Sequence, residues 1–189
     1  MKHKISLSII VFFICVTSFS CVKERTVTFK NNSQTSVDVT FNDVEKTIEK
    51  DEEAVFTVEE NNTFHYKAVT KGKTPTGKPL GMEIVWEDEV TTNRSKKNIS
   101  FDVNHEYFFL KIQNNSSKEI ARIFVNYEKE DETEEDFIIP ANGYLYDVGY
   151  YKAHIDTRVS LKFVDSEDIF IYDVGSVAEP NQVIELIYK

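Results

Sequence analysis

Val27-Thr28-Phe29-Lys30-Asn31-Asn32-Ser33 and Leu110-Lys111-Ile112-Gln113-Asn114-Asn115-Ser116 share one pattern, in which apolar and polar residues alternate up to two asparagines and a serine. The two stretches lie 83 positions apart in a chain of 189 residues. Alternation with a period of two is typical of a strand with one buried face, and Asn-Asn-Ser is a turn signal. The chain therefore repeats a strand that ends in a turn.

Further similarities follow this pair in the same order along the chain. They match Val37–Asn42 with Ile120–Asn126 (allowing one inserted residue), Ala54–Val58 with Leu145–Val148, Tyr66–Val69 with Leu161–Val164, and Ile99–Val103 with Ile184–Tyr188. A period of this length is too long for one unit of a solenoid, so it indicates two copies of a small domain. We place these domains at 26–106 and 107–189.

Each copy is predicted to consist of short strands. In the first copy they are Val27–Phe29, Val37–Phe41, Ala54–Val58, Phe64–Val69, Glu83–Trp86 and Ile99–Val103. In the second they are Phe108–Ile112, Ile120–Tyr127, Phe137–Ile139, Tyr144–Val148, Val159–Val164, Ile169–Tyr172 and Val183–Tyr188. Six or seven strands in about 80 residues, separated by turn signals, are typical of an Ig-like or fibronectin-like sandwich. The predicted fold is all-β, with two tandem antiparallel β-sandwich domains.

The N-terminus has the layout of an export signal. Basic residues in Met1–Lys4 precede an apolar stretch, Ile5–Phe19, which is too short to span a bilayer as a helix. We therefore expect residues 1–20 to be a signal peptide and the mature chain to have no membrane-spanning helix.

Ser18-Phe19-Ser20-Cys21 follows the apolar stretch and resembles the lipobox of bacterial lipoproteins. Ser18 stands where most lipoboxes have leucine, as in the relaxed lipoboxes of Bacteroidota and spirochaetes. The resemblance implies that Cys21 is lipidated and becomes the new N-terminus, with 21–25 as a short tether. Cys15, the only other cysteine, would be removed with the signal. The alternative is ordinary cleavage after Ser20, which would release a secreted protein.

Composition excludes several functions. The chain has 22 Lys and Arg against 32 Asp and Glu, a net charge of −10, which argues against a nucleic-acid partner because phosphate binding needs clustered basic residues. The histidines are widely spaced and show no metal-ligand pattern, and no nucleophile motif is present. We predict no catalytic residues, no metal site and no cofactor, and hence a protein that is not an enzyme.

Two groups of residues are candidates for partner binding. The segment Thr70–Gly81 is predicted to be a long loop, and its Lys71, Lys73 and Lys78 form the main basic patch of an acidic protein. Tyr150 and Tyr151 belong to a tyrosine-rich region, and exposed tyrosines near aspartate stack sugars or bind proteins. The alternative for both groups is structural, as a solvated connection and as packed aromatic rings.

Alternation places two further tyrosines, Tyr144 and Tyr146, on one face of a strand, where core packing is favoured over ligand binding. The acidic segment Glu128–Asp136 is predicted to be a solvated hairpin tip, with calcium binding as a hypothesis prompted by its charge.

The sequence thus predicts a lipid-anchored envelope or surface lipoprotein with a non-enzymatic binding or adhesion role. Its acyl chains would hold it at the outer membrane or cell surface, facing either the exterior or the periplasm, and its partner would be a protein or a glycan. Two alternatives remain, namely an accessory subunit of an envelope or surface assembly, docking through a strand edge, and a glycan-acting hydrolase with paired carboxylates.

Overall fold

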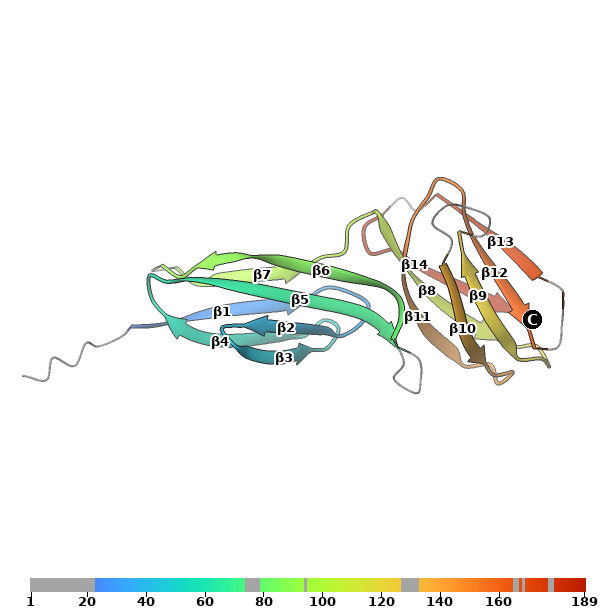
Figure 1. Ribbon diagram of the computed structural model, residues 1–189, viewed down its shortest axis with the longest axis horizontal. Coiled ribbons are helices and arrows are strands. Elements are labelled where there is room, and N and C mark those ends of the chain that lie inside the picture. The colour runs from blue at the N-terminus through green and yellow to red at the C-terminus, as the bar shows by residue number, and fades with distance from the viewer. Residues whose placement is uncertain are drawn as a thin grey trace, which may run out of the picture.

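The structure is a computed structural model that describes residues 23–73, 79–93, 95–126, 133–164, 167, 169–176 and 179–189. The regular secondary structure in these ranges consists of β-strands (Figure 1). The first seven are β1 Glu24–Asn31, β2 Val37–Phe41, β3 Val44–Ile48, β4 Glu53–Glu59, β5 Thr63–Lys73, β6 Pro79–Thr91 and β7 Lys97–Phe101. The others are β8 Tyr107–Asn114, β9 Ile120–Val125, β10 Thr133–Ile139, β11 Leu145–Lys152, β12 Thr157–Phe163, β13 Ile169–Gly175 and β14 Val183–Tyr188. No helix long and apolar enough to cross a membrane occurs in these ranges.

The strands form two sandwiches with the same topology. In domain 1, a sheet of order β4-β1-β7 packs on a sheet of order β3-β2-β5-β6. In domain 2, β11-β8-β14 packs on β10-β9-β12-β13, which is the same order seven strands further on. The predicted all-β fold with two sandwiches is therefore confirmed. One pairing in each domain departs from the antiparallel prediction, because β1 pairs with β7 and β8 with β14 in parallel.

The strand registers shift two of the predicted matches between the domains by two residues each. Asn31 lies opposite Phe101 and Asn114 lies opposite Tyr188, so Phe101 corresponds to Tyr188, two residues beyond the match derived from the sequence. The match for β5 and β12 is displaced by two residues in the opposite direction, since Ala68 corresponds to Leu161. A slip of two residues keeps every side chain on its face of the sheet, so alternation alone does not detect it. The inserted residue is a bulge at Ala121, which the pairing with β12 skips.

A buried asparagine closes the first turn of domain 1. Asn31 is fully buried, and its Nδ2 donates to the carbonyl oxygens of Thr35 at 2.7 Å and Ile48 at 2.9 Å. Its Oδ1 accepts from the backbone N–H and the hydroxyl of Ser33, at 2.8 and 2.7 Å. The side chain thus ties β1 to the next turn and to the end of β3.

Domain 2 repeats this arrangement atom for atom. Asn114 is also fully buried, and its Nδ2 donates to the carbonyl oxygens of Lys118 at 2.8 Å and Ile139 at 3.2 Å. Its Oδ1 accepts from the N–H and the hydroxyl of Ser116, at 3.1 and 2.7 Å. A buried polar group without a hydrogen-bond partner lowers the stability of the fold. This cost explains why both domains have the same Asn-x-Ser pair although their neighbouring apolar residues differ.

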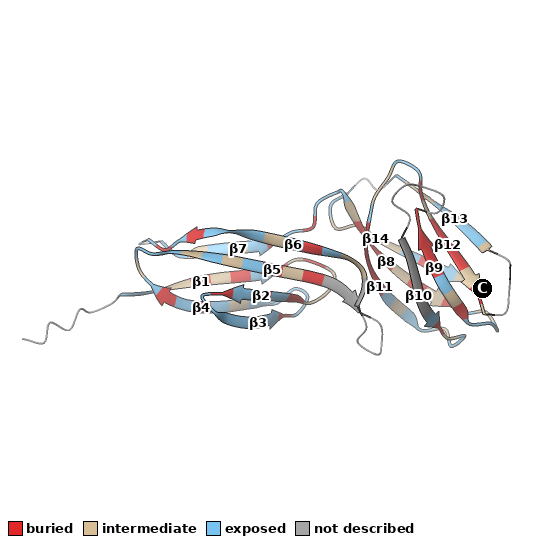
Figure 2. Cartoon of the chain, in the orientation of Figure 1, coloured by how far each residue is buried: buried red, intermediate tan, exposed pale blue. Residues whose placement is uncertain are grey.

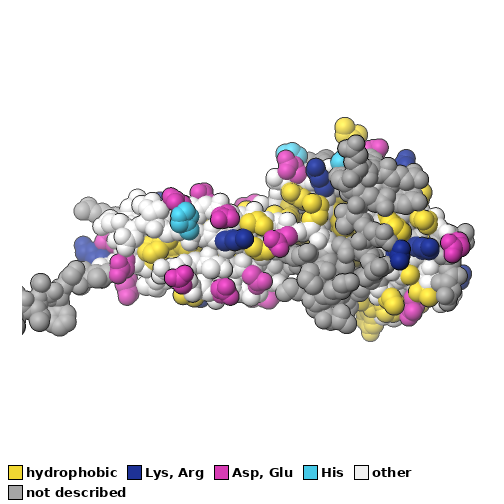
Figure 3. All heavy atoms as spheres, in the orientation of Figure 1, with side chains coloured by type: hydrophobic (Ala, Val, Ile, Leu, Met, Phe, Trp, Pro, Cys, Tyr) yellow, Lys and Arg dark blue, Asp and Glu magenta, His cyan; other side chains and the backbone are white. Residues whose placement is uncertain are grey.

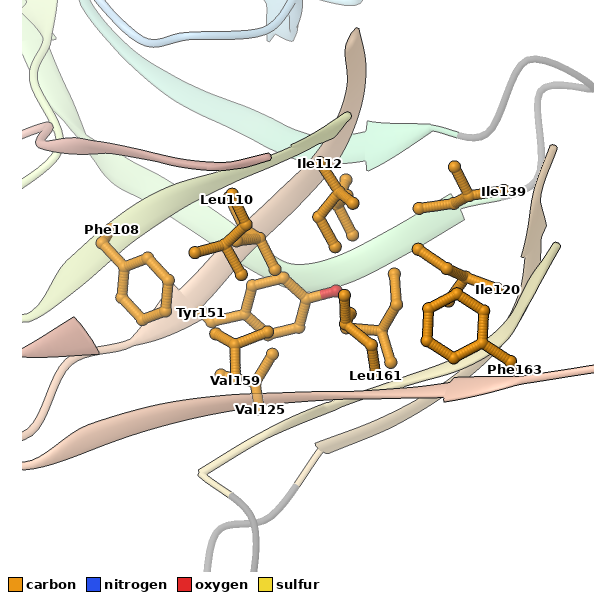
Figure 4. Packing of buried hydrophobic residues seen from close by; sticks show 13 residues of the cluster. Phe108, Leu110, Ile112, Ile120, Val125, Ile139, Tyr151, Val159, Leu161 and Phe163 are labelled. Carbon is orange, nitrogen blue, oxygen red and sulfur yellow. The ribbon is translucent and has the colours of Figure 1, made fainter. Parts of the chain in front are cut away.

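Each sandwich has its own core of buried residues (Figure 2). In domain 1 the ring of Phe29 lies 5.2 to 5.6 Å from four other rings, those of Phe41, Phe56, Tyr66 and Phe101. In domain 2 the ring of Tyr151 lies among aliphatic side chains of both sheets, including Leu110 and Leu161 (Figure 4).

Three predictions about connections need correction. Strand β3 was missed, because it is an edge strand in which only Ile48 is buried and no alternation is visible. The expected long loop Thr70–Gly81 is largely strand, since β5 runs to Lys73 and β6 begins at Pro79. The expected acidic hairpin tip Glu128–Asp136 is also partly strand, because β10 begins at Thr133.

Candidate functional site

The structure separates the residues predicted to bind partners. Lys71 and Lys73 lie on strand β5, which removes them from the predicted loop. Cys21 and Lys78 lie outside the described residues, as does most of the acidic segment.

The prediction that Tyr150 and Tyr151 contact a partner at the surface is wrong. Both side chains are fully buried. Neighbouring residues of a strand point to opposite faces, so Tyr151 enters the core of domain 2 while Tyr150 points away from it. The outward face of β11 is covered by domain 1, which is why the ring of Tyr150 is not exposed.

Tyr146 packs against the core of domain 2, as expected, and its hydroxyl accepts from Nδ2 of Asn142 at 2.7 Å. Tyr144 precedes β11 and is 70% exposed, so its expected place in the core is wrong.

Tyr150 lies at the centre of an apolar cluster that both domains build. Ile84 and Val103 come from domain 1, and Phe109 and Tyr150 come from domain 2. The two rings meet edge to face, with centroids 4.9 Å apart. We call this cluster, with its polar contacts, the domain junction.

Three consecutive hydrogen bonds form the polar part of the domain junction. The Tyr150 hydroxyl accepts from the backbone N–H of Gln34 at 2.6 Å and donates to Oδ1 of Asn181 at 2.8 Å. Nδ2 of Asn181 donates in turn to the carbonyl oxygen of Asn32 at 2.7 Å. The turn after β1 in domain 1 is therefore held by two side chains of domain 2.

Gly81 on β6 allows the two backbones to approach closely. A Cβ at this position would lie 2.7 Å from the carbonyl oxygen of Tyr150 and 2.9 Å from its nitrogen. Gly81 also has a φ of +70°, which side chains disfavour. The β5–β6 hairpin thus packs against β11 only if position 81 is glycine. The domain junction joins the two domains end to end (Figure 1).

Burial raises the pKa of Tyr150 to about 12, because the phenolate would lose its hydration, and the hydrogen bond from the Gln34 N–H offsets this only in part. Below pH 10 both the folded and the unfolded chain keep the proton. Between pH 10 and pH 12 the unfolded chain ionises first, so stability is lost as the pH rises. We expect the stability advantage of the wild type over Tyr150→Phe to fall by roughly 2–3 kcal/mol across this range.

Urea denaturation of both proteins from pH 9 to pH 12 measures this difference. Tyr144→Phe is the matched control, since it removes the same hydroxyl from an exposed side chain. A constant difference between the wild type and Tyr150→Phe would contradict the burial of this hydroxyl.

Figure 1 marks the C-terminus, where strand β14 ends, at the end of domain 2 that faces away from domain 1. A second aromatic group includes Tyr188 at this end. The rings of Phe163, Phe170 and Tyr188 lie 4.7 to 5.3 Å apart. They line a pocket of about 200 Å³ together with Ser116, Ser117, Lys118 and Lys189. We call this the distal pocket; it combines aromatic rings, two cationic side chains and a turn. No sequence pattern marked it, because its residues come from four separate segments.

The histidines offer no comparable site. Nε2 of His65 lies 2.9 Å from Oε1 of Glu89, and both side chains are exposed. His105 and His154 line an open groove near the domain junction with Lys152 and Ile155. In the described part of the chain, no group of three or more His, Cys, Asp and Glu side chains is arranged to hold a metal ion.

No family model and no curated protein matches this chain. Among solved structures, the Bacillus anthracis TIE protein has a TM-score of 0.28 and 13% identity over 88% of this chain and 34% of its own. A streptococcal ancillary pilin has a TM-score of 0.30 and 10% identity over 88% of this chain and 62% of its own. The chain thus spans less than two thirds of either protein, and these scores carry no argument about function.

Proposed function

We propose that this chain is a lipid-anchored, non-enzymatic binding component of the bacterial envelope, which presents the distal end of domain 2 to a partner. The observation that carries the proposal is the domain junction, because a buried tyrosine bonded to both domains makes two sandwiches into one elongated body. An elongated body held at one end is suited to presenting its other end.

The anchor in this proposal is Cys21, on the evidence of its lipobox. Strand β1 of domain 1 begins at Glu24, only three residues beyond it, so domain 1 would lie close to the bilayer. Acidic side chains are spread along the visible face of domain 1 (Figure 3). Such a surface is repelled by anionic lipids, so acyl chains rather than charge would hold the protein at the membrane.

Replacing Cys21 by serine tests the anchor. We expect the wild type to partition into the detergent phase of a Triton X-114 extract, and its N-terminal peptide to carry the mass of a diacylglyceryl group. Cys21→Ser should move to the aqueous phase, because a lipid tail adds about 0.8 kcal/mol of membrane affinity for each buried methylene. An unmodified mature wild type beginning at Cys21, or one cleaved elsewhere, would contradict the proposal.

The side of the membrane is a separate question, which protease treatment of intact and permeabilised cells answers. Digestion in intact cells places the binding end outside the cell, where a matrix or glycan partner is expected. Protection until permeabilisation places it in the periplasm, where the partner belongs to the envelope.

An accessory subunit of an envelope assembly is the second candidate, and strand β13 favours it. This strand lies at the edge of its sheet, and its Phe170 and Ile171 are 40% and 52% exposed. Apolar edge strands pair with strands of other chains unless they are protected. Recovery of a stoichiometric complex from detergent extracts would support this role.

A further inference from the structure

Through the repeat, the distal end of domain 2 corresponds to the end of domain 1 on which domain 2 packs. Asn31 and Asn114 make the same hydrogen bonds, which fixes the correspondence of the turns that follow them. The turn after Asn31 is where domain 2 docks. The turn after Asn114 lines the distal pocket.

The contacts of domain 1 therefore have direct counterparts in domain 2. In domain 1, the Gln34 N–H and the Asn32 carbonyl oxygen bind Tyr150 and Asn181. The corresponding groups are the N–H of Ser117 and the carbonyl oxygen of Asn115. The correspondence is supported by the backbone, since Asn32 N donates to Phe101 O and Asn115 N donates to Tyr188 O.

Apolar residues lie beside each turn, but at different positions of the repeat, since the strand registers match Tyr188 with Phe101 and Phe170 with Trp86. At the domain junction, Ile84 and Val103 are covered by the ring of Tyr150. Beside the second turn lie Phe163, Phe170 and Tyr188, and Phe170 is 40% exposed. The distal pocket thus combines the repeated turn with aromatic residues of its own, and part of that aromatic area is exposed.

Charge and the repeat together indicate the partner. Lys118 and Lys189 line the distal pocket, and these two cationic side chains favour a segment that carries acidic residues. A second copy of this chain lacks the required tyrosine in domain 1. Tyr150 pairs with Phe109, and the residues at the corresponding positions, Thr57 and Thr26, are threonines.

We propose that the distal pocket docks a protein segment that presents a tyrosine flanked by acidic residues. The tyrosine hydroxyl accepts from the N–H of Ser117, its ring packs on Phe170 and Tyr188, and the carboxylates face Lys118 and Lys189. This proposal rests on the binding role proposed above and specifies its site and partner class.

A capped peptide, Glu-Asp-Tyr-Asp-Glu, is the probe. It is titrated into the exported chain carrying Cys21→Ser and labelled with ¹⁵N, and the amide resonances are followed. We expect saturable shifts at Ser117, Lys118 and Tyr188 with a dissociation constant on the order of 1 mM, as for a short unstructured ligand. The same peptide with phenylalanine should bind about threefold more weakly, because the hydroxyl contact is lost.

Lys118→Glu should weaken binding by about fivefold or more, since it reverses a charge beside the pocket. Lys96→Glu is the matched control, because Lys96 is an exposed lysine in domain 1 and its reversal changes the net charge equally. Tyr188→Ala should remove the shifts at Ser117 while the resonances of domain 1 stay in place, which shows that the chain remains folded.

Three results would overturn the proposal: no shifts at peptide concentrations of about 10 mM, shifts confined to another surface, or shifts at Ser117 that depend on protein concentration without peptide. The last result would identify a second copy as the occupant. None of them depends on Cys21, so failure here is distinguishable from failure of the lipid anchor.

Discussion

Replacing Asn114 by alanine is expected to lower the free energy of unfolding of domain 2 by roughly 3–5 kcal/mol, since each buried polar group left unpaired costs about 1–3 kcal/mol. The side chain makes four hydrogen bonds, and its loss leaves the carbonyl oxygen of Ile139 without this donor inside the core. A single sandwich has a total stability of about 5–15 kcal/mol, so much of it would be lost.

Urea denaturation followed by resolved resonances of each domain measures the effect. Asn115→Ala is the matched control, because Asn115 is the adjacent asparagine and is exposed, so its change should be within about 0.5 kcal/mol. Asn31→Ala should have the corresponding effect in domain 1. A loss below about 1 kcal/mol for Asn114→Ala would show that the buried turn is not a determinant of the fold.

Gly81→Ala is expected to disrupt the domain junction. The new Cβ would lie 2.7 Å from the carbonyl oxygen of Tyr150, so β6 and β11 must separate. Separation would weaken the hydrogen bonds of Tyr150 and open the apolar cluster, and we expect a loss of roughly 2–4 kcal/mol in the coupling of the two domains. The measurement is the shift of the Tyr150 and Gln34 amide resonances, together with two separate unfolding transitions in place of one.

Gly175→Ala is the control for backbone strain. Gly175 has a φ of +75°, close to that of Gly81, but a Cβ there would meet no atom within 4 Å. Its substitution carries the conformational cost of about 1 kcal/mol without the clash. If both variants behave alike, strain rather than the close approach explains the effect of Gly81→Ala.

Much of the fold could be predicted because it depends on patterns that are local in sequence. Alternation and the Asn-x-Ser turns identified two sandwiches and most of their strands. Strand β3 could not be found, because an edge strand with only Ile48 buried has no apolar face. The exact pairing of β7 and β14 could not be found either, because alternation is unchanged by a slip of two residues.

The candidate sites were harder to predict, because they depend on contacts between distant segments. Tyr150 was singled out from the sequence, but burial by domain 1 turns it from a surface contact into the centre of the junction. Its partners Gln34 and Asn181 are 116 and 31 residues away. The distal pocket likewise depends on residues far apart in the sequence, which the fold brings together.

The rigid joining of the two sandwiches is the central claim, and residual dipolar couplings test it most directly. Backbone N–H couplings of the exported chain carrying Cys21→Ser, measured in a weakly aligned medium, report the orientation of each domain separately. The account predicts that one alignment tensor fits β1–β7 and β8–β14 together, and that Gly81→Ala requires two. Two tensors of different magnitude in the chain with Gly81 intact would show that the domains move independently and would contradict the account.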